Sequence, residues 1–480
     1  MSLRSSTLKN LGVVTAAQLI ALAVTQLALL VLAHLLTPSD FGLYAIVMVI
    51  YNIAMIVATA GLDQAAVQSK EDEQTVLSTG VFLRGIVTAS VVAAIVVLAP
   101  LISSFFDLPE LTLPLRVMSI AVAVSFLSIY PFVRLNRQLR FTHLSIGRLA
   151  YATIWPAVAV FAALAGVDYW SLVLALVGAN LALSLTLLYF EPWRLSFRID
   201  MGVGKRLLRY GNYAMLAAVV SILLINLDKV VIGRMLSEEL LGAYYLAFTW
   251  GMAVPNLFTN IANSVMFPTY SQISCDKDLL RRAYVKTFTY LSYVSLPIGV
   301  GLAAVSEIFV RGILGPEWAE AIVPLAVISM VGLLYSLTSP AIMVFLAIGR
   351  PELQLKQAII TFVPFLLLIV PSVFYFDLTG ASLLLLAVSA ASFVWVLRVA
   401  ARLIEENPLS IVSKIRKPAA SSLAMGIVVL VASALVPVNV IGFLALVALG
   451  VASYMIAMYS MTGGAFIREA KAIVHTILSK

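Results

Sequence analysis

Long apolar segments separated by short polar connections follow one another along the whole chain. At a rise of 1.5 Å per residue, about 20 apolar residues in a helix cross a hydrocarbon core of about 30 Å. The segments lack the ten-residue alternation that is typical of membrane β-barrels. The pattern predicts about fourteen transmembrane helices, at residues 10–36, 41–63, 79–105, 113–134, 146–166, 169–190, 211–235, 239–265, 288–312, 320–348, 356–376, 380–403, 418–436 and 440–462.

The second half of the chain repeats the first at an offset of 200 residues. Residues 26–47 (QLALLVLAHLLTPSDFGLYAIV) and 226–248 (NLDKVVIGRMLSEELLGAYYLAF) each read as the end of one helix, a short turn and the start of the next. The matched pairs are Leu36 and Leu236, Gly42 and Gly242, Tyr44 and Tyr244, Thr59 and Thr259, and Asp63 and Asn263. We therefore predict two pseudo-symmetric, parallel six-helix lobes, 1–199 and 200–405, followed by 406–480 with two added helices and an amphipathic tail.

Composition and charge placement support an all-α integral membrane protein. The chain is 62% hydrophobic and 11% charged, whereas about a quarter of the residues of a soluble domain are charged. Most basic residues lie in alternate connections, which indicates that both termini are cytoplasmic. This placement also explains the net charge of +8, so that charge does not indicate nucleic-acid binding. Two segments, Met201 to Tyr210 and Ala465 to Lys480, are expected to form amphipathic helices at the membrane surface.

The sequence lacks the motifs of an enzyme active site. The three histidines (His34, His143 and His475) are far apart, Cys275 is the single cysteine, and there is no phosphate-binding glycine loop or zinc motif. We predict no catalytic residues, no metal and no cofactor.

Polar residues inside the predicted helices are the candidates for function, because a charge at the bilayer centre costs about 2.5–3.5 kcal/mol. Asp228 and Lys229 lie inside the seventh span, just after Asn226. Neighbours on a helix point about 100° apart, so the two charges are not expected to pair on one lipid-facing stripe, and at least one should face a cavity. They either pair with a neighbouring helix or form a substrate or ion-coupling site.

Polar stripes on the first two helices of each half form a second group of candidates. Three amides of the eighth span recur at i, i+4 and i+7, and spans one and two carry similar polar positions. They indicate either a hydrated lumen or hydrogen bonds between helices. These candidates are Asn256, Asn260 and Asn263, Gln18 and Thr25, and Asn52 and Asp63.

Three arginines, Arg84, Arg148 and Arg398, are predicted at cytoplasmic depth in spans three, five and twelve. They either fix the orientation of the chain in the membrane or line an inward-facing cationic vestibule for a phosphorylated substrate.

Several motifs, in their order and spacing, resemble the Wzx-type polysaccharide-repeat-unit flippases of the multidrug/oligosaccharidyl-lipid/polysaccharide flippase superfamily, in particular the branch that exports colanic-acid-like exopolysaccharide. The motifs are LLTPSDFGLYA, GLDQAAVQ, LLRYGNY, NLDKVVIGRML, LLGAYYLA, VMFPTYS and ILGPEWAEAIVPLAVIS.

The resemblance implies a bacterial plasma-membrane carrier that moves an undecaprenyl-diphosphate-linked oligosaccharide to the outer leaflet by alternating access, coupled to H⁺ or Na⁺ or drawn by polymerisation. Asp228 and Lys229 match the charged position of the family's seventh span, whereas the arginines that related lipid-precursor flippases carry in their first two helices are missing here. Lipids and the polysaccharide polymerase and export machinery would be its partners, and we expect a monomer.

Two other functions are considered. A cation-coupled multidrug antiporter of the same superfamily would share the twelve-helix core, but would show a sharper acidic cation site and would usually lack the last two spans. A membrane-embedded polymerase or ligase would need a large outer loop with basic catalytic residues, and the outer turns here are short and acidic.

Overall fold

The computed structural model describes residues 3–59, 61–69, 71–194 and 198–463, and within these ranges it describes side chains outside 3–17, 64, 68, 210–214, 216–221, 224–225, 257–258 and 260–265. The described residues form helices and connecting turns, without a β-strand among them. They divide into two compact units, Met1–Tyr245 and Leu246–Lys480, so the division falls inside one helix, α10.

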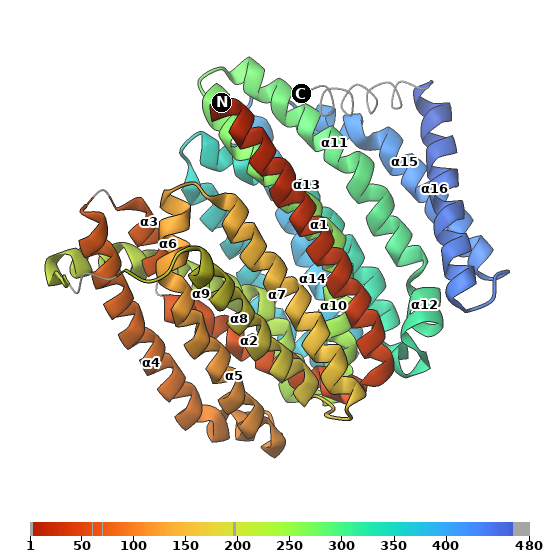
Figure 1. Ribbon diagram of the computed structural model, residues 1–480. Helices are drawn as coiled ribbons and strands as arrows, with labels where there is room; N and C mark the ends of the chain where they lie inside the picture. The colour runs from red at the N-terminus through yellow and green to blue at the C-terminus, as the bar shows by residue number, and fades with distance from the viewer. Residues whose placement is uncertain (1–2, 60, 70, 195–197, 464–480) are drawn as a thin grey trace. The chain divides into compact units, whose positions relative to one another are not determined.

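The first unit contains nine helices and the beginning of α10 (Figure 1). Helix α7 packs along both α1 and α8, α4 lies beside α5, and α9 packs on α2, α3 and α4. The elements are α1 (Leu3–Leu35), α2 (Pro38–Thr59), α3 (Leu62–Gln68), α4 (Glu73–Phe105), η1 (Pro109–Leu111), α5 (Thr112–Ser125), η2 (Phe126–Ser128), α6 (Ile129–Arg137), α7 (Phe141–Leu164), α8 (Trp170–Phe190), α9 (Met201–Met235) and α10 (Glu238–Ile273).

In the second unit, α11 packs against α13 and α15, and α13 packs along α14. The two predicted additional helices are α15 and α16, which lie side by side (Figure 1). The hydroxyl of Tyr454 on α16 donates to the carbonyl of Tyr293 on α11 at 3.0 Å, which ties the added pair to the unit. The elements are α11 (Lys277–Ala304), α12 (Ser306–Phe309), η3 (Val310–Leu314), η4 (Pro316–Ala321), α13 (Ile322–Ala347), α14 (Pro351–Leu403), α15 (Pro408–Ser433) and α16 (Val440–Thr462).

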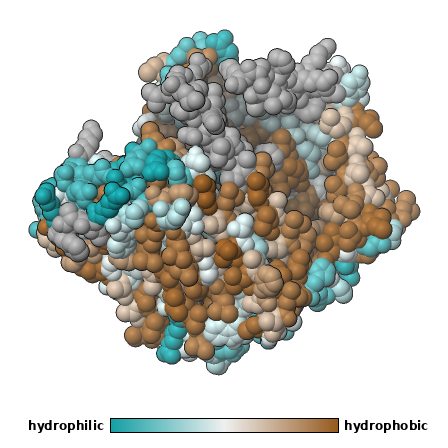
Figure 2. Space-filling model, viewed as in Figure 1, coloured by the Kyte–Doolittle hydropathy of each residue, from teal (hydrophilic) through white to brown (hydrophobic). Residues whose placement is uncertain are grey.

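The helices confirm the predicted all-α membrane fold and its approximate number of spans. Among the described residues, eleven helical segments are long and apolar enough to cross a membrane. One of them, α14, has 53 residues and is broken at Asp377, whose φ of 49° is not helical, so it supplies two spans. The described residues thus supply twelve spans, and α9 and α10, with 35 and 36 residues, are two further helices of sufficient length. Apolar side chains cover much of the visible face (Figure 2), as expected of helices that meet lipid.

Two local expectations from the sequence were wrong. The second span does not continue to residue 63: α2 ends at Thr59, and Gly61, with φ 63°, separates it from α3, so Asp63 lies on a short helix of its own. Residues 201–210 do not form a separate surface helix. They are the first turns of α9, and Val203 and Leu207 are buried with side chains of α3, α4 and α6. The predicted amphipathic tail, 465–480, lies outside the described residues.

Candidate functional site

Asp228 is the centre of a buried polar cluster that links α9 to α10. The hydroxyl of Tyr244, on the second turn of α10, donates to Asp228 Oδ2 at 2.8 Å. Asp228 Oδ1 accepts from the backbone N–H of Lys229 at 2.8 Å and lies 3.3 Å from Lys229 Nζ. All three residues are at least 95% buried. A carboxylate in this position needs such donors, because an unpaired buried charge would cost several kcal/mol.

Asp228 and Lys229 form an ion pair although they are neighbours in sequence, and the pair is buried inside the protein rather than placed on an exposed stripe. Their Cα–Cβ bonds do point about 100° apart, but the flexible four-carbon stem of lysine lets its ammonium fold back onto the neighbouring carboxylate. Asn226, two residues before Asp228 on α9, is also buried, and its amide donates to the carbonyl of Ile222 at 2.8 Å. The structure therefore brings Asp228 and Lys229 together, whereas Asn226 bonds to its own helix.

The N-terminal turns of α2 and α10 are packed against each other at two glycines that the repeat makes equivalent. A Cβ added to Gly42 would lie 1.9 Å from the carbonyl oxygen of Glu238, and a Cβ added to Gly242 would lie 1.8 Å from that of Pro38. Residues 38 and 238 are themselves separated by the 200-residue offset, so the contact is reciprocal. The two copies of the repeat thus meet through their backbones, at an approach that no residue with a Cβ would permit.

Side chains around the two glycines fix both helix starts and join them. At the start of α2, Asp40 Oδ2 accepts from Thr37 N at 2.8 Å and from Thr37 Oγ1 at 2.7 Å, and Asp40 N donates back to Thr37 Oγ1 at 3.3 Å, which is a capping box. The other carboxylate oxygen of Asp40 accepts from the backbone N–H of Tyr169, between α7 and α8, at 3.1 Å. Ser39 Oγ donates to Glu238 Oε1 at 2.7 Å, which directly connects the two repeats.

A second buried ion pair joins α3 to α4. Arg84 Nη1 donates to Asp63 Oδ1 at 2.9 Å, and the arginine side chain is 3% exposed. Arg84 Nε is buried without a hydrogen-bond partner among the described residues, as is the hydroxyl of Thr88 one turn later. Burial raises the pKa of Asp63, and Arg84 lowers it only in part. The Arg84 side chain is therefore turned into the protein toward α3, and one of its donors has no acceptor among the described residues.

The other predicted residues occupy other positions on the helices. Gln18, Thr25 and Asn52 are half-buried, whereas Asn256, Arg148 and Arg398 are exposed on their helices. The side chains of Asn260 and Asn263 lie outside the part of the structure that is described. Whether any of them contacts a substrate stays a prediction.

Sequence reasoning missed the tyrosines that complete the buried network. Besides Tyr244, Tyr51 on α2 donates to Asn180 on α8 at 2.9 Å. Tyr44, the repeat partner of Tyr244, accepts from Trp155 Nε1 at 3.3 Å and packs edge-on against Tyr245, with ring centroids 6.0 Å apart. The available signal was the repeat, which aligned Tyr44 with Tyr244 next to the matched glycines.

Comparison with known proteins places the chain in a family. Residues 31–323, more than half of the chain, match the family described as polysaccharide biosynthesis protein. The chain is 28% identical over 304 residues to the teichuronic acid biosynthesis protein TuaB of Bacillus subtilis, a match that spans 62% of each chain and thus less than two thirds of that relative. It is 25% identical over 363 residues to the lipopolysaccharide biosynthesis protein WzxC of Escherichia coli, covering 74% of this chain and 73% of WzxC.

The fold is that of a solved flippase. The lipid II flippase MurJ, in its inward closed conformation, is similar with a TM-score of 0.76 over 95% of this chain and 99% of MurJ, at 14% sequence identity. At that identity the likeness concerns the fold. Together with the family match, it confirms the resemblance seen in the motifs: the chain belongs to the polysaccharide biosynthesis protein family and has the fold of a lipid-precursor flippase.

Proposed function

We propose that the protein is a flippase that moves polyprenyl-diphosphate-linked oligosaccharides across the membrane for polysaccharide biosynthesis. Its family and relatives are named for polysaccharide biosynthesis, and the solved structure that shares its fold is a flippase of a lipid-linked precursor. The undecaprenyl diphosphate carrier, which the motif resemblance implies, is the substrate class we assign.

Such a substrate needs a protein because its headgroup cannot cross lipid unaided. Several sugars and a diphosphate would each leave hydroxyls and charges without hydrogen bonds in hydrocarbon, at a cost of several kcal/mol per group. A polar path between helices, with the prenyl chain left in the lipid, removes most of that cost. The polar residues within the described helices are the groups from which such a path is built.

The observation that carries the proposal is the reciprocal contact of the two repeats at Gly42 and Gly242. A carrier that opens alternately to the two sides needs equivalent elements that meet and then separate. The contact lies at the helix starts that the charge pattern predicts to be outermost, and its hydrogen bond, from Ser39 to Glu238, is a single neutral-to-charged bond that can break and re-form. We infer that this contact closes the outer end in one state and opens in the other, with the lobes bounded near residues 199 and 405.

The charged pairs have different roles in this proposal. Asp228, Lys229 and Tyr244 bond to one another and hold α9 to α10, so that this helical hairpin moves as one piece. Arg84, whose Nε has no partner among the described residues, is the candidate that offers a donor to the diphosphate. Gln18, Thr25, Asn52, Asn256, Asn260, Asn263, Arg148 and Arg398 are proposed to line the path, and Asp63 or Asp228 to carry H⁺ or Na⁺.

The setting follows from the same reasoning. We propose a bacterial plasma membrane with both termini in the cytoplasm, a monomer without catalytic residues of its own, and a polymerase that consumes the flipped units.

The test is flipping by the purified chain in proteoliposomes. A fluorescent undecaprenyl-diphosphate oligosaccharide is incorporated, and the headgroup that reaches the far leaflet is measured with and without a pH or sodium gradient. Exposure that depends on the protein supports the proposal, and its dependence on the gradient identifies the coupling ion. Empty liposomes serve as the control. Arg84→Ala protein is the test variant and is expected to lower the rate of flipping.

Transport of small organic cations without headgroup exposure would instead favour the multidrug antiporter, which shares the superfamily.

A further inference from the structure

One transmembrane helix of the second unit exposes a tyrosine at its middle. Tyr335 lies halfway along α13 and is 51% exposed. The positions one and two turns away on the same face are buried, namely Ile328 and Val331 before it and Ser339 and Ile342 after it. The exposure of Tyr335 is therefore local and does not continue along the helix.

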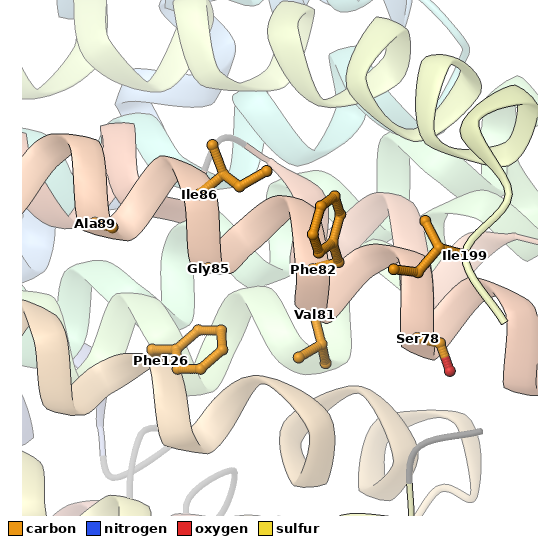
Figure 3. Close-up of a pocket in the computed structure, with 8 residues that line it drawn as sticks. All are labelled: Ser78, Val81, Phe82, Gly85, Ile86, Ala89, Phe126 and Ile199. Carbon is orange, nitrogen blue, oxygen red and sulfur yellow. The ribbon is translucent and has the colours of Figure 1, made fainter. Parts of the chain in front are cut away.

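Helix surfaces that meet lipid have a different pattern, as α4 shows. Phe82, Ile86 and Ala89, which are labelled in Figure 3, are exposed at i, i+4 and i+7. The hollow that they line contains apolar residues and glycine apart from Ser78. Acyl chains cover such a stripe over its whole length. A tyrosine that is exposed between buried neighbours does not belong to a stripe of this kind.

Helices α10 and α13 cross at a row of small and polar residues. A Cβ added to Gly332 would lie 2.9 Å from the carbonyl oxygen of Gly251 and 2.7 Å from Pro255. One turn further along both helices, the hydroxyls of Thr259 and Ser336 share a hydrogen bond of 3.1 Å. The contacts of residues 255 and 259 are made with residues 332 and 336, at a constant offset of 77 residues. The two helices therefore run in the same direction.

Asn256 and Tyr335 lie on the same side of this crossing. Asn256 follows the contact residue Pro255 by about 100° around α10, and Tyr335 precedes the contact residue Ser336 by about 100° around α13. Because the helices are parallel and face each other, a forward turn on one and a backward turn on the other lead to the same side. At the offset of 77 residues, the two positions differ in depth by two residues, or about 3 Å.

Both side chains are available to a ligand. Asn256 is exposed on α10, and the described side chain one turn later, Thr259, is buried. Neither the amide of Asn256 nor the hydroxyl of Tyr335 bonds to a residue that the structure describes. Polar groups without partners at this depth in a membrane protein are expected to serve a polar ligand.

The chemistry of the two helices indicates the kind of ligand. Helix α13 has no charged residue, and α10 has none after Glu239. A diphosphate requires cationic donors, which these helices do not supply. A tyrosine has an apolar ring and a polar tip, and an amide both donates and accepts hydrogen bonds, as a hydroxyl does. A neutral group with an apolar face and a rim of hydroxyls fits this pair.

We propose that Tyr335 and Asn256 form a binding subsite for the sugars of the substrate. The ring of Tyr335 stacks on the C–H face of a pyranose, and its hydroxyl and the amide of Asn256 bond to the sugar hydroxyls. This assignment rests on the proposed function and deepens it, because it names residues of the second unit that read the headgroup. The diphosphate is left to cationic residues elsewhere in the chain.

The experiment measures the affinity of the full chain in nanodiscs for two probes by native mass spectrometry. One probe is undecaprenyl diphosphate that carries a galactose–glucose disaccharide, and the other is undecaprenyl diphosphate without sugar. Tyr335→Leu removes the ring, and Tyr335→Phe removes only the hydroxyl. Tyr375→Leu is the matched control, because Tyr375 is also an exposed tyrosine of this unit but lies beside the break of α14 at Asp377.

We expect the affinity for the disaccharide probe to fall about tenfold in Tyr335→Leu, which corresponds to about 1.4 kcal/mol. In Tyr335→Phe it should fall about threefold, because the ring remains and one hydrogen bond is lost. The affinity for the sugar-free probe should be the same in every variant, which also shows that each variant is folded. Tyr375→Leu should bind both probes as the wild type does.

Equal losses of affinity for the two probes in Tyr335→Leu would overturn the proposal, as would a loss in Tyr375→Leu of the same size. Flipping of the disaccharide probe is measured in parallel on the same proteins, which separates the two hypotheses. If the wild type flips this probe and Tyr335→Leu binds it as tightly, the subsite fails and the flippase function stands. If the loss depends on the sugar and the wild type does not flip the probe, the subsite stands and the function fails.

Discussion

Replacing Gly242 by alanine tests the closing contact with one methyl group. The new Cβ would lie 1.8 Å from the carbonyl oxygen of Pro38, a distance at which the backbones of α2 and α10 must move apart. Overpacking of a well-packed site costs about 1–3 kcal/mol. This cost applies only while the two helices touch, so it destabilises the closed arrangement relative to the open one. The open population should therefore rise about 5- to 150-fold.

The open population can be measured with a cysteine at position 39. Ser39 is half-buried and bonded to Glu238 in the closed contact, and the single native cysteine, Cys275, is first replaced by serine. Ser39→Cys should react with a membrane-impermeant maleimide in proportion to the open fraction. We expect labelling in Gly242→Ala to be faster by a factor within the range above. Gly42→Ala should raise the labelling rate by a similar factor. In the double variant, the change in the free energy of opening should be smaller than the sum of the two single changes, because the first methyl already separates the helices.

Gly80→Ala is the control for the general effect of alanine in a helix, since an added Cβ there meets nothing within 4 Å. It should leave labelling unchanged. Labelling in folded Gly242→Ala that equals the wild-type rate would refute the idea that the contact closes this end. Labelling in Gly80→Ala that rises as much would show that helix propensity, rather than the contact, is responsible.

Other changes test this contact and the two ion pairs. A disulfide between cysteines at 39 and 238 should hold the helices together and stop flipping until it is reduced; flipping at the wild-type rate with the disulfide formed would show that the helices need not separate. Asp228→Leu leaves Lys229 buried without its carboxylate and should lower the free energy of unfolding by about 3–5 kcal/mol. The double variant Asp228→Leu with Lys229→Met should lower it less, and denaturation midpoints measure both. Asp228→Asn is expected to lower flipping in folded protein. Burial raises the pKa of Asp63 in the folded state. Above that pKa the ionised side chain therefore destabilises the folded protein, and this destabilisation disappears as the side chain is protonated at lower pH. The unfolding midpoint of the wild type should therefore fall relative to Asp63→Asn as pH rises from about 3.9, the ordinary aspartate pKa, and a difference that is constant with pH would contradict the shift.

Hydropathy was sufficient to predict the helices because each span needs about 20 apolar residues, whatever its neighbours are. It could not place the end of the second span. The apolar run continues through residue 61, and the break there is set by the left-handed backbone of Gly61, which polarity does not record. Asp63 was therefore assigned to the second span rather than to α3, and its ion pair with Arg84 on α4 was not foreseen.

The 200-residue repeat predicted that Gly42 and Gly242 are equivalent, but equivalence does not imply contact. Equivalent positions of two helices come together only where the helices cross, and that crossing is set by the packing of the whole first unit. The pairing of Asp228 with Tyr244 depends on the same hairpin geometry. Positions of residues along helices could be predicted, whereas the contacts across helices could not.

The closing contact also bears on how such a protein can diversify. Helices α2 and α10 meet there through main-chain atoms, Gly42 against the carbonyl of residue 238 and Gly242 against that of residue 38. Main-chain atoms are the same in every sequence, so the contact restricts the chain at two glycines and leaves most surrounding side chains free to vary. Under the proposed function, residues along the transport path can then change to suit a new sugar while this contact stays as it is, which separates the evolution of substrate choice from that of the transport cycle.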